Sequence, residues 1–248
     1  MLPIQDSIPS RNVPIVTWLL ITVNCCVFFI ELALPEPFLE QVIYCLGVVP
    51  ARFTYEGWGC QLGPTTNSFW PFLTSMFLHG GWVHIISNMW CLWIFGDNVE
   101  DRMGHIRYLV FYLVCGILAG IVHVLANANS TVPAIGASGA IAGVLGAYFI
   151  FFPTSRIIVL VPLLFWPIFF VMPAFLYLGI WFLLQFFSGS LALVSSSSAA
   201  GGVAWWAHIG GFVGGAALHR LFVARPRRRV RMYSNNIEYG PRGAWSRF

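Results

Sequence analysis

Two stretches decide how this chain folds, Gly136-Ala137-Ser138-Gly139-Ala140 and Ala207-His208-Ile209-Gly210-Gly211. Both lie between Tyr108 and His219, an interval in which Arg156 is the only formally charged residue. A serine hydroxyl and an imidazole are costly in hydrocarbon, so such residues inside an apolar span are candidates for function. The two stretches therefore suggest a nucleophile and a base that meet inside a membrane.

The composition is that of a polytopic membrane protein. Of the 248 residues, 58% are hydrophobic and 9% are charged, whereas soluble domains carry about 25% charged residues. We expect an all-α fold, one compact bundle of six membrane-spanning helices, because six segments approach the roughly 20 residues that a hydrocarbon core requires. Within the fifth segment, Pro162, Pro167 and Pro173 predict a tilted or kinked helix. The six segments are 14–33, 72–95, 108–126, 136–153, 157–187 and 203–223.

Charge predicts the orientation of this bundle. We divide the chain into a segment 1–13, a membrane domain 14–223 and a basic tail 224–248. The 13 basic residues are all arginines. With an even number of spans, both termini lie on the same side of the membrane. That side holds every arginine except Arg52, which lies alone on the other side. The positive-inside rule therefore predicts cytoplasmic termini. The tail arginines fit anionic lipid head groups better than nucleic acid. The absence of lysine and the compact layout favour a bacterial plasma membrane.

Small residues predict which spans touch. They recur at intervals that give one smooth face on the fourth span and one on the sixth, so the two backbones can approach closely. Ser138 and His208 would then lie within hydrogen-bond reach, with His208 as a general base for the serine. Two structural alternatives remain: Ser138 bonds its own helix backbone, and His208 makes an ordinary interhelical hydrogen bond. The faces consist of Gly136, Gly139 and Gly143, and of Ala207, Gly211 and Gly215.

The second span supplies further polar residues. His84 and Asn88 are four residues apart and so share a helix face. Together with the backbone N–H of Ser138, they could donate hydrogen bonds to an anionic tetrahedral oxygen. His79 lies nearer the external end, where it either supports the site or is simply an interfacial polar residue. A metal site of His79 and His84 is disfavoured, because their spacing makes them diverge and no carboxylate or thiolate completes the set.

The fourth span is short, which predicts the depth of the site. About 18 residues precede its end at Pro153, or roughly 27 Å of helix. Ser138 would then lie a few ångströms below the external surface, in a water-filled pocket that opens to that side. The first external loop, from about Ala33 to Pro71, is rich in proline and tryptophan and is expected to lie partly in the interface. It contains Cys45 and Cys60, for which a disulfide is conceivable.

Five motifs, taken together and in this order, resemble the rhomboid family of intramembrane serine proteases. The resemblance covers most of the chain, roughly from Leu46 to Leu221. The motifs are Leu46-Gly-Val-Val-Pro-Ala-Arg52, the set His79, His84 and Asn88, Glu100-Asp-Arg-Met-Gly-His-Ile-Arg107, Gly136-Ala-Ser-Gly139 and Ala207-His-Ile-Gly-Gly-Phe212.

The resemblance implies a function and roles for these residues. Ser138 and His208 would be a catalytic dyad, and His84, Asn88 and the Ser138 amide would form an oxyanion hole. The first loop would wedge into lipid, and the fifth span and the loop after it would act as gate and cap. Substrates would be transmembrane proteins, and no metal or other cofactor is expected. One departure is Ala142, where some members of the family carry an aromatic ring that stacks on the histidine; Trp205 or Trp206 would have to restrain His208 instead.

Two other functions remain as alternatives. A non-catalytic relative that binds membrane clients would not need both dyad residues and both oxyanion donors, yet all four are present. A small transporter or channel would be expected to carry intramembrane charges or matched half-helix breaks, which these spans lack.

Overall fold

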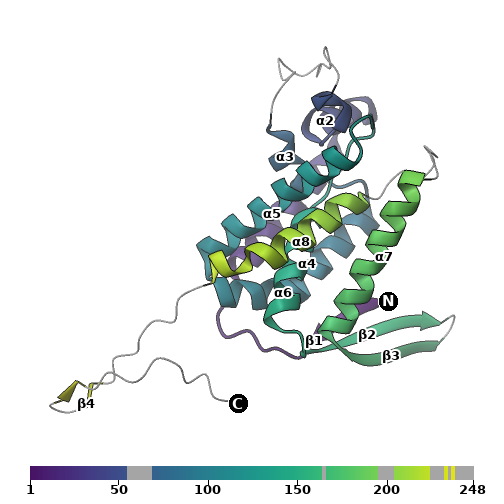
Figure 1. The fold of residues 1–248 in the computed structure, drawn as a ribbon. Coiled ribbons are helices and arrows are strands. Elements are labelled where there is room, and N and C mark those ends of the chain that lie inside the picture. Colours follow the sequence, from purple (N-terminus) through teal and green to yellow (C-terminus); the bar gives the residue numbers. More distant parts are fainter. Residues whose placement is uncertain (55–68, 164–165, 195–203, 224–231, 234–235, 238–248) are drawn as a thin grey trace.

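The computed structural model describes residues 1–54, 69–163, 166–194, 204–223, 232–233 and 236–237. Residues 195–202 of the loop that is expected to act as a cap, Cys60 and most of the basic tail lie outside this part. Within it, short elements connect the first and second long helices: α2 (Glu36–Leu46), η1 (Pro50–Phe53), α3 (Pro71–Thr74) and η2 (Ser75–Phe77). The long helices are α1 (Ile15–Ala33), α4 (Trp82–Met103), α5 (His105–Ala126), α6 (Ser138–Phe151), α7 (Ala174–Val194) and α8 (Trp205–Phe222) (Figure 1).

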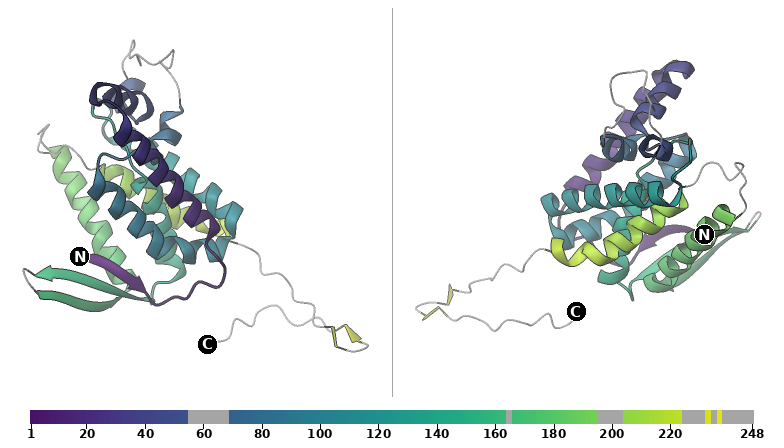
Figure 2. Two further views of the ribbon diagram at one scale, coloured as in Figure 1. Left: turned by 180° about the vertical axis from the view of Figure 1, so that it is seen from behind. Right: turned by 45° about the horizontal axis from the view of Figure 1, so that its top comes forward.

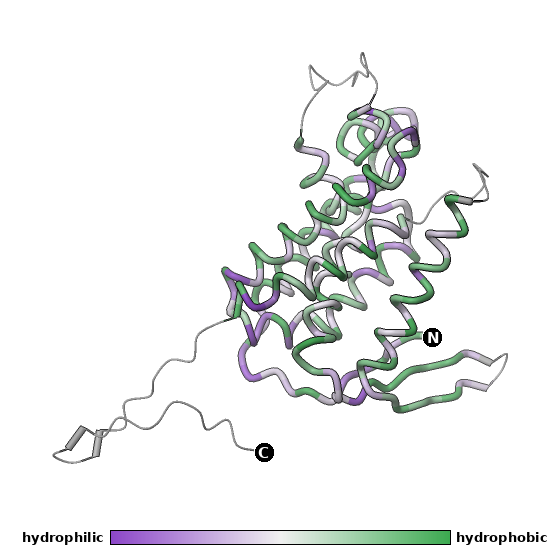
Figure 3. The backbone as a smooth tube through the Cα atoms, viewed as in Figure 1, coloured by the Kyte–Doolittle hydropathy of each residue, from purple (hydrophilic) through white to green (hydrophobic). Residues whose placement is uncertain are grey.

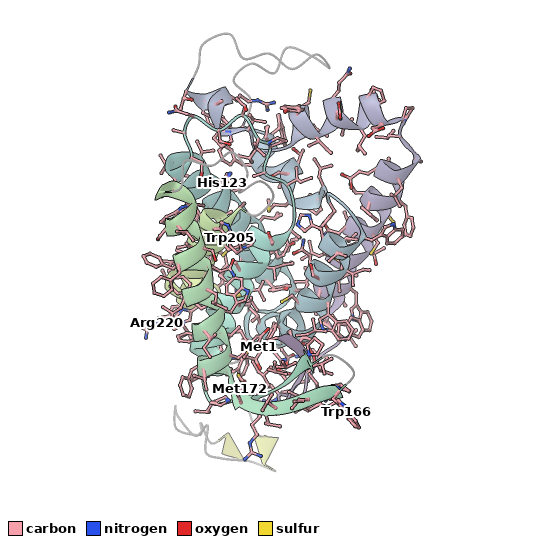
Figure 4. The ribbon with its side chains drawn as sticks, turned by 90° about the vertical axis from the view of Figure 1, so that its right-hand side faces the viewer. Met1, His123, Trp166, Met172, Trp205 and Arg220 are labelled. Carbon is pink, nitrogen blue, oxygen red and sulfur yellow. The ribbon has the colours of Figure 1, made fainter. Side chains whose placement is uncertain are left out.

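Five strands complete the described elements: β1 (Leu2–Asp6), β2 (Arg156–Leu163), β3 (Trp166–Pro173), β4 (Met232–Tyr233) and β5 (Asn236–Ile237). We call the end of the bundle that carries α2 and α3 the loop end, and the end that carries β1, β2 and β3 the sheet end. Figure 4 shows Trp205 toward the loop end, and Met172 and Trp166 at the sheet end.

The helices are those of a membrane protein. Among the described residues, three segments are long and apolar enough to cross a membrane: α1, α5 and Ala174–Leu193 of α7. Helix α6 is apolar but has 14 residues, about 21 Å, against a hydrocarbon core of about 30 Å. Figure 3 shows hydrophobic residues along the helices and hydrophilic ones at the turn between α4 and α5. That α4, α6 and α8 also cross the membrane stays a prediction.

The fold is mostly helical, but the prediction of a helix over the whole of 157–187 is wrong. Strands β2 and β3 form an antiparallel hairpin there, paired from Arg156 with Pro173 to Leu163 with Trp166, and α7 begins only afterwards. The reason is local: the run is rich in β-branched and aromatic residues, which favour strands, and its prolines kink or break a helix. Pro162 and Pro167 face each other across the hairpin.

The N-terminal segment joins this sheet. Strand β1 pairs antiparallel with β2, which gives the order β1-β2-β3 at the sheet end (Figure 2). The indole of Trp90 on α4 donates a hydrogen bond of 2.6 Å to the carbonyl of Pro3. A carboxylate oxygen of Asp6 accepts hydrogen bonds from Tyr148 on α6 (2.5 Å) and Asn98 on α4 (2.9 Å). The expectation of an all-α fold is therefore wrong at this end.

Glycines bring α6 and α8 into direct backbone contact, as their spacing predicts. A Cβ atom added at Gly211 would lie 2.0 Å from the carbonyl oxygen of Gly139. One added at Gly215 would lie 2.0 Å from the carbonyl oxygen of Gly143. No side chain larger than hydrogen fits either place, so these glycines set the distance between the two helices.

Candidate active site

Ser138 and His208 lie side by side where α6 and α8 begin. Ser138 is the first residue of α6 and His208 is in the first turn of α8. The Oγ atom of Ser138 is 2.8 Å from the Nε2 atom of His208, an ordinary hydrogen-bond distance. Both residues are half-buried. A hydroxyl next to an imidazole nitrogen is the geometry that general-base activation of a serine requires.

The second ring nitrogen of His208 also has a partner. Its Nδ1 atom is 2.7 Å from the Oε1 atom of Gln185 on α7, and the Gln185 residue is only 8% exposed. Sequence reasoning missed Gln185. A signal was present, because Gln185 is the only amide side chain between residues 157 and 187, and polar groups in apolar spans are candidates for function.

Two tryptophans flank the His208 ring. The ring of Trp181 on α7 is tilted by 34° to it at a centroid distance of 5.9 Å. Trp205, one of the two rings expected from the sequence, meets it edge-on at 6.4 Å and 87°. Ala142 occupies the position at which some members of the resembled family carry an aromatic ring, and it is fully buried on α6. The nearer of the two rings, that of Trp181, therefore comes from a different helix than the resemblance implies, and sequence reasoning missed it.

His84 and Asn88 face Gly136, just before the serine. A Cβ atom at Gly136 would lie 2.6 Å from Nε2 of His84 and 3.6 Å from Nδ2 of Asn88. The backbone N–H of Gly80 donates to Nδ1 of His84 at 3.3 Å, so in the neutral ring Nε2 carries the hydrogen. The amide nitrogen of Asn88, which is 6% exposed, has no hydrogen-bond partner among the described residues. Two N–H donors thus point toward one small space.

His79 lies behind His84. It is 3% exposed, its ring centroid is 5.1 Å from that of His84, and neither of its ring nitrogens has a partner within the described ranges. Its backbone N–H donates to the carboxylate of Glu31 on α1, at 3.2 and 3.3 Å. Sequence reasoning missed this buried acid. In the part of the chain that the structure describes, no group of three or more His, Cys, Asp or Glu could hold a metal ion.

The first loop holds the segment that leads to Ser138. Val48 and Ala134 exchange backbone hydrogen bonds of 3.0 and 2.8 Å, and the N–H of Gly136 donates to the carbonyl of Ser75 at 2.8 Å. Arg52, 2% exposed, donates to the carbonyls of residues 44 and 45 at 2.6 and 3.1 Å. Its burial lowers the pKa of its guanidinium.

A disulfide also involves this loop. Cys45 is disulfide-bonded. The other described cysteines, Cys25, Cys26, Cys91 and Cys115, are free thiols. The partner expected from the sequence, Cys60, falls outside the described residues.

With this geometry in place, the comparisons with known proteins identify the family. Residues 66–225 match the Rhomboid domain, which is more than half of the chain. The chain belongs to the rhomboid family. This rhomboid is 30% identical over 179 residues to "RHOMBOID-like protein 6, mitochondrial" of Arabidopsis thaliana, a match that covers 71% of this chain and 51% of that protein.

Two further relatives extend the range of sources. "Presenilin-associated rhomboid-like protein A, mitochondrial" of Danio rerio is 31% identical over 131 residues, 51% of this rhomboid and 34% of that protein. "Rhomboid protease GluP" of Bacillus subtilis is 41% identical over 81 residues, 33% and 15% of the two chains. The rhomboid described here thus spans about half or less of the length of these relatives. Because two of the names are mitochondrial, the relatives do not support the predicted bacterial plasma membrane.

Proposed function

We propose that this rhomboid is an intramembrane serine endopeptidase, with Ser138 as the nucleophile and His208 as the general base. The observation that carries the proposal is the 2.8 Å contact between Oγ of Ser138 and Nε2 of His208, in a bundle of apolar helices. An unpaired polar group in such surroundings is costly, but this pairing alone would also satisfy a structural role. The donors around Gly136 favour catalysis, since a structural pair does not need them.

The proposed reaction runs in two steps. The Oγ atom of Ser138 attacks the carbonyl carbon of the scissile peptide while its proton passes to Nε2 of His208. The N–H groups of His84 and Asn88 and the backbone N–H of Ser138 stabilise the negative charge that develops on the carbonyl oxygen. The first-turn N–H groups of a helix have no intrahelical partner, so the start of α6 adds to this field. His208 then protonates the leaving amine, and water hydrolyses the acyl-enzyme by the same route.

The proposed substrates are membrane proteins cut in or near a transmembrane segment, because the serine lies at the start of α6 among apolar helices. His79 and Gly139 support the site without touching the substrate. His79 packs against the ring of His84, and Gly139 lets α8 approach α6. The lipid bilayer is the surrounding medium, and the reaction as written needs no metal or other cofactor.

Active-site labelling tests the proposal. A fluorophosphonate probe should label the purified wild-type protein in detergent, and a model transmembrane substrate should be cleaved. Ser138→Ala and His208→Ala should each reduce the cleavage rate by about 10⁴-fold or more, since members of a nucleophile–base pair act as a unit. Ser10→Ala, at an exposed serine of the N-terminal segment, should retain wild-type activity.

Two results would contradict the proposal. Cleavage that survives Ser138→Ala would end the proposal. If the folded wild type neither labels nor cleaves, the alternative of a non-catalytic protein that binds membrane clients would stand instead.

A further inference from the structure

We infer that Gln185 is a positioning residue that fixes the tautomer and the orientation of His208. This inference rests on the proposed function, in which His208 is the base, and it adds a third member on a third helix. No acidic residue takes that place in the described site, where Gln185 Oε1 is the partner of Nδ1.

The two hydrogen bonds of the imidazole determine which nitrogen carries the hydrogen. The structure places the amide oxygen of Gln185, Oε1, 2.7 Å from Nδ1 of His208, and because an amide oxygen only accepts, Nδ1 is the donor in this arrangement. Nε2 then has a free lone pair directed at Oγ of Ser138, 2.8 Å away. The opposite tautomer would require the amide of Gln185 to turn over, so that its NH2 group faces Nδ1, and it would leave Nε2 unable to take the serine proton.

Helix α7 fixes the ring plane as well as the tautomer. Trp181 precedes Gln185 by four residues and so lies on the same face of α7. Its ring lies 5.9 Å from the imidazole at 34°, while Gln185 holds the ring edge. One face of one helix therefore restrains His208 in two directions, and this compensates for the small Ala142.

An amide at position 185 suits the apolar helices around it better than a carboxylate would. A carboxylate among apolar helices costs several kcal/mol of desolvation, whereas a neutral amide orients the ring without that cost. The amide stabilises the imidazolium through a dipole and not a full charge.

This arrangement makes the dyad depend on α7. Helix α7 packs mainly against α8, and Phe182 contacts Phe212 at a ring distance of 5.0 Å. Gly189 continues the same face, and a Cβ atom there would lie 3.1 Å from Trp205. When α7 separates from α8, His208 loses both Gln185 and Trp181, so the dyad is correctly oriented only while α7 is docked.

Kinetics of Gln185→Met, which keeps the size but removes the acceptor, test the inference. We expect kcat for a transmembrane substrate and the fluorophosphonate labelling rate to fall about 10- to 100-fold, a part of the 10²–10⁴-fold that a general base contributes. KM should change by no more than about twofold, because Gln185 does not touch the substrate. Gln185→Glu should recover most of the lost rate at alkaline pH, where the introduced carboxyl is ionised and accepts from Nδ1. Leu184→Met, on the exposed face of α7, is the matched control and should behave as wild type.

A second measurement does not require activity. In ¹⁵N-histidine-labelled protein at neutral pH, the signals of His208, assigned with His208→Ala, should show hydrogen on Nδ1 in the wild type and a mixture of tautomers in Gln185→Met. If the wild type fails to label or cleave, the proposed function fails, while these spectra still decide the role of Gln185. A wild type with hydrogen on Nε2, or a Gln185→Met variant with unchanged tautomer and rate, would overturn the inference.

Discussion

At the scale of single residues, the absence of a side chain at Gly136 shapes the site as much as the side chains around it do. Gly136 has φ +122°, a conformation that side chains rarely adopt, and any Cβ there would press on the His84 ring. In the proposed mechanism, the missing side chain leaves room for a substrate oxygen beside the donors of His84 and Asn88. Gly80 holds the His84 tautomer through its backbone N–H. Backbone groups thus prepare the side chains that we propose to act on the substrate.

Asn88 offers the sharpest residue-scale prediction. Asn88→Ala removes one donor to the developing oxyanion and should lower kcat by about 10²–10³-fold. Asn88→Asp keeps the shape but presents an anionic acceptor, so it should be at least as impaired. Ser87→Ala, the exposed neighbour on α4, is the control. Steady-state cleavage measures all three, and an Asn88→Ala variant with wild-type kcat would remove Asn88 from the oxyanion hole.

At the scale of elements, two acids fasten the N-terminal region to the bundle. Glu100, 2% exposed, accepts the backbone N–H groups of Val16 and Thr17 at 2.9 and 2.8 Å, and so caps the start of α1 from another helix. Asp6 ties β1 to α4 and α6. Burial raises the pKa of Asp6 above its ordinary 3.8, although the hydrogen bond from Tyr148 opposes this shift.

The raised pKa of Asp6 predicts how β1 docking depends on pH. When β1 is docked, Asp6 binds its proton more tightly than when β1 is free. The docking is therefore most stable below the ordinary pKa of 3.8, and it weakens as the pH rises through the raised pKa. Hydrogen exchange of residues 2–6, corrected for the intrinsic effect of pH, should therefore show less protection as the pH rises. Asp6→Asn should abolish this dependence. Protection of the wild type that increases with pH would contradict the prediction.

At the scale of the whole molecule, the contact between α6 and α8 holds the proposed dyad together. Gly215→Ala places a Cβ atom 2.0 Å from a backbone carbonyl of α6, which cannot move like a flexible side chain. We expect a loss of about 3 kcal/mol in unfolding free energy, seen as a lower Tm in detergent, together with slower labelling of Ser138. Gly179→Ala on α7 is the matched control: no atom lies within 4 Å of its added Cβ, so its Tm should stay equal or rise slightly. Equal Tm values for the two variants would contradict the prediction.

Much of this architecture can be predicted from the sequence because it depends on spacing. Glycine intervals predict that α6 meets α8, and the four-residue interval predicts that His84 and Asn88 share a face. Hydropathy alone does not predict β2 and β3, because a short apolar run is compatible with a strand or a helix. The β-branched and aromatic residues and the prolines of the run distinguish the two. The partners of Gln185, Trp181 and Glu31 cannot be predicted, because they are distant in sequence and depend on how whole helices pack.

The pairing of β1 with β2 has a consequence for how the protein is assembled in the cell. Leu2 is opposite Leu160, so the first strand leaves the ribosome long before its partner exists. At about 5–20 residues per second of synthesis, that delay is on the order of 10–30 s. During this time α1, α4 and α5 are already made, and the sheet that leads into α7 can close only after them. Translation order therefore makes the sheet end, and with it the helix that carries Gln185, one of the last parts to take its final place.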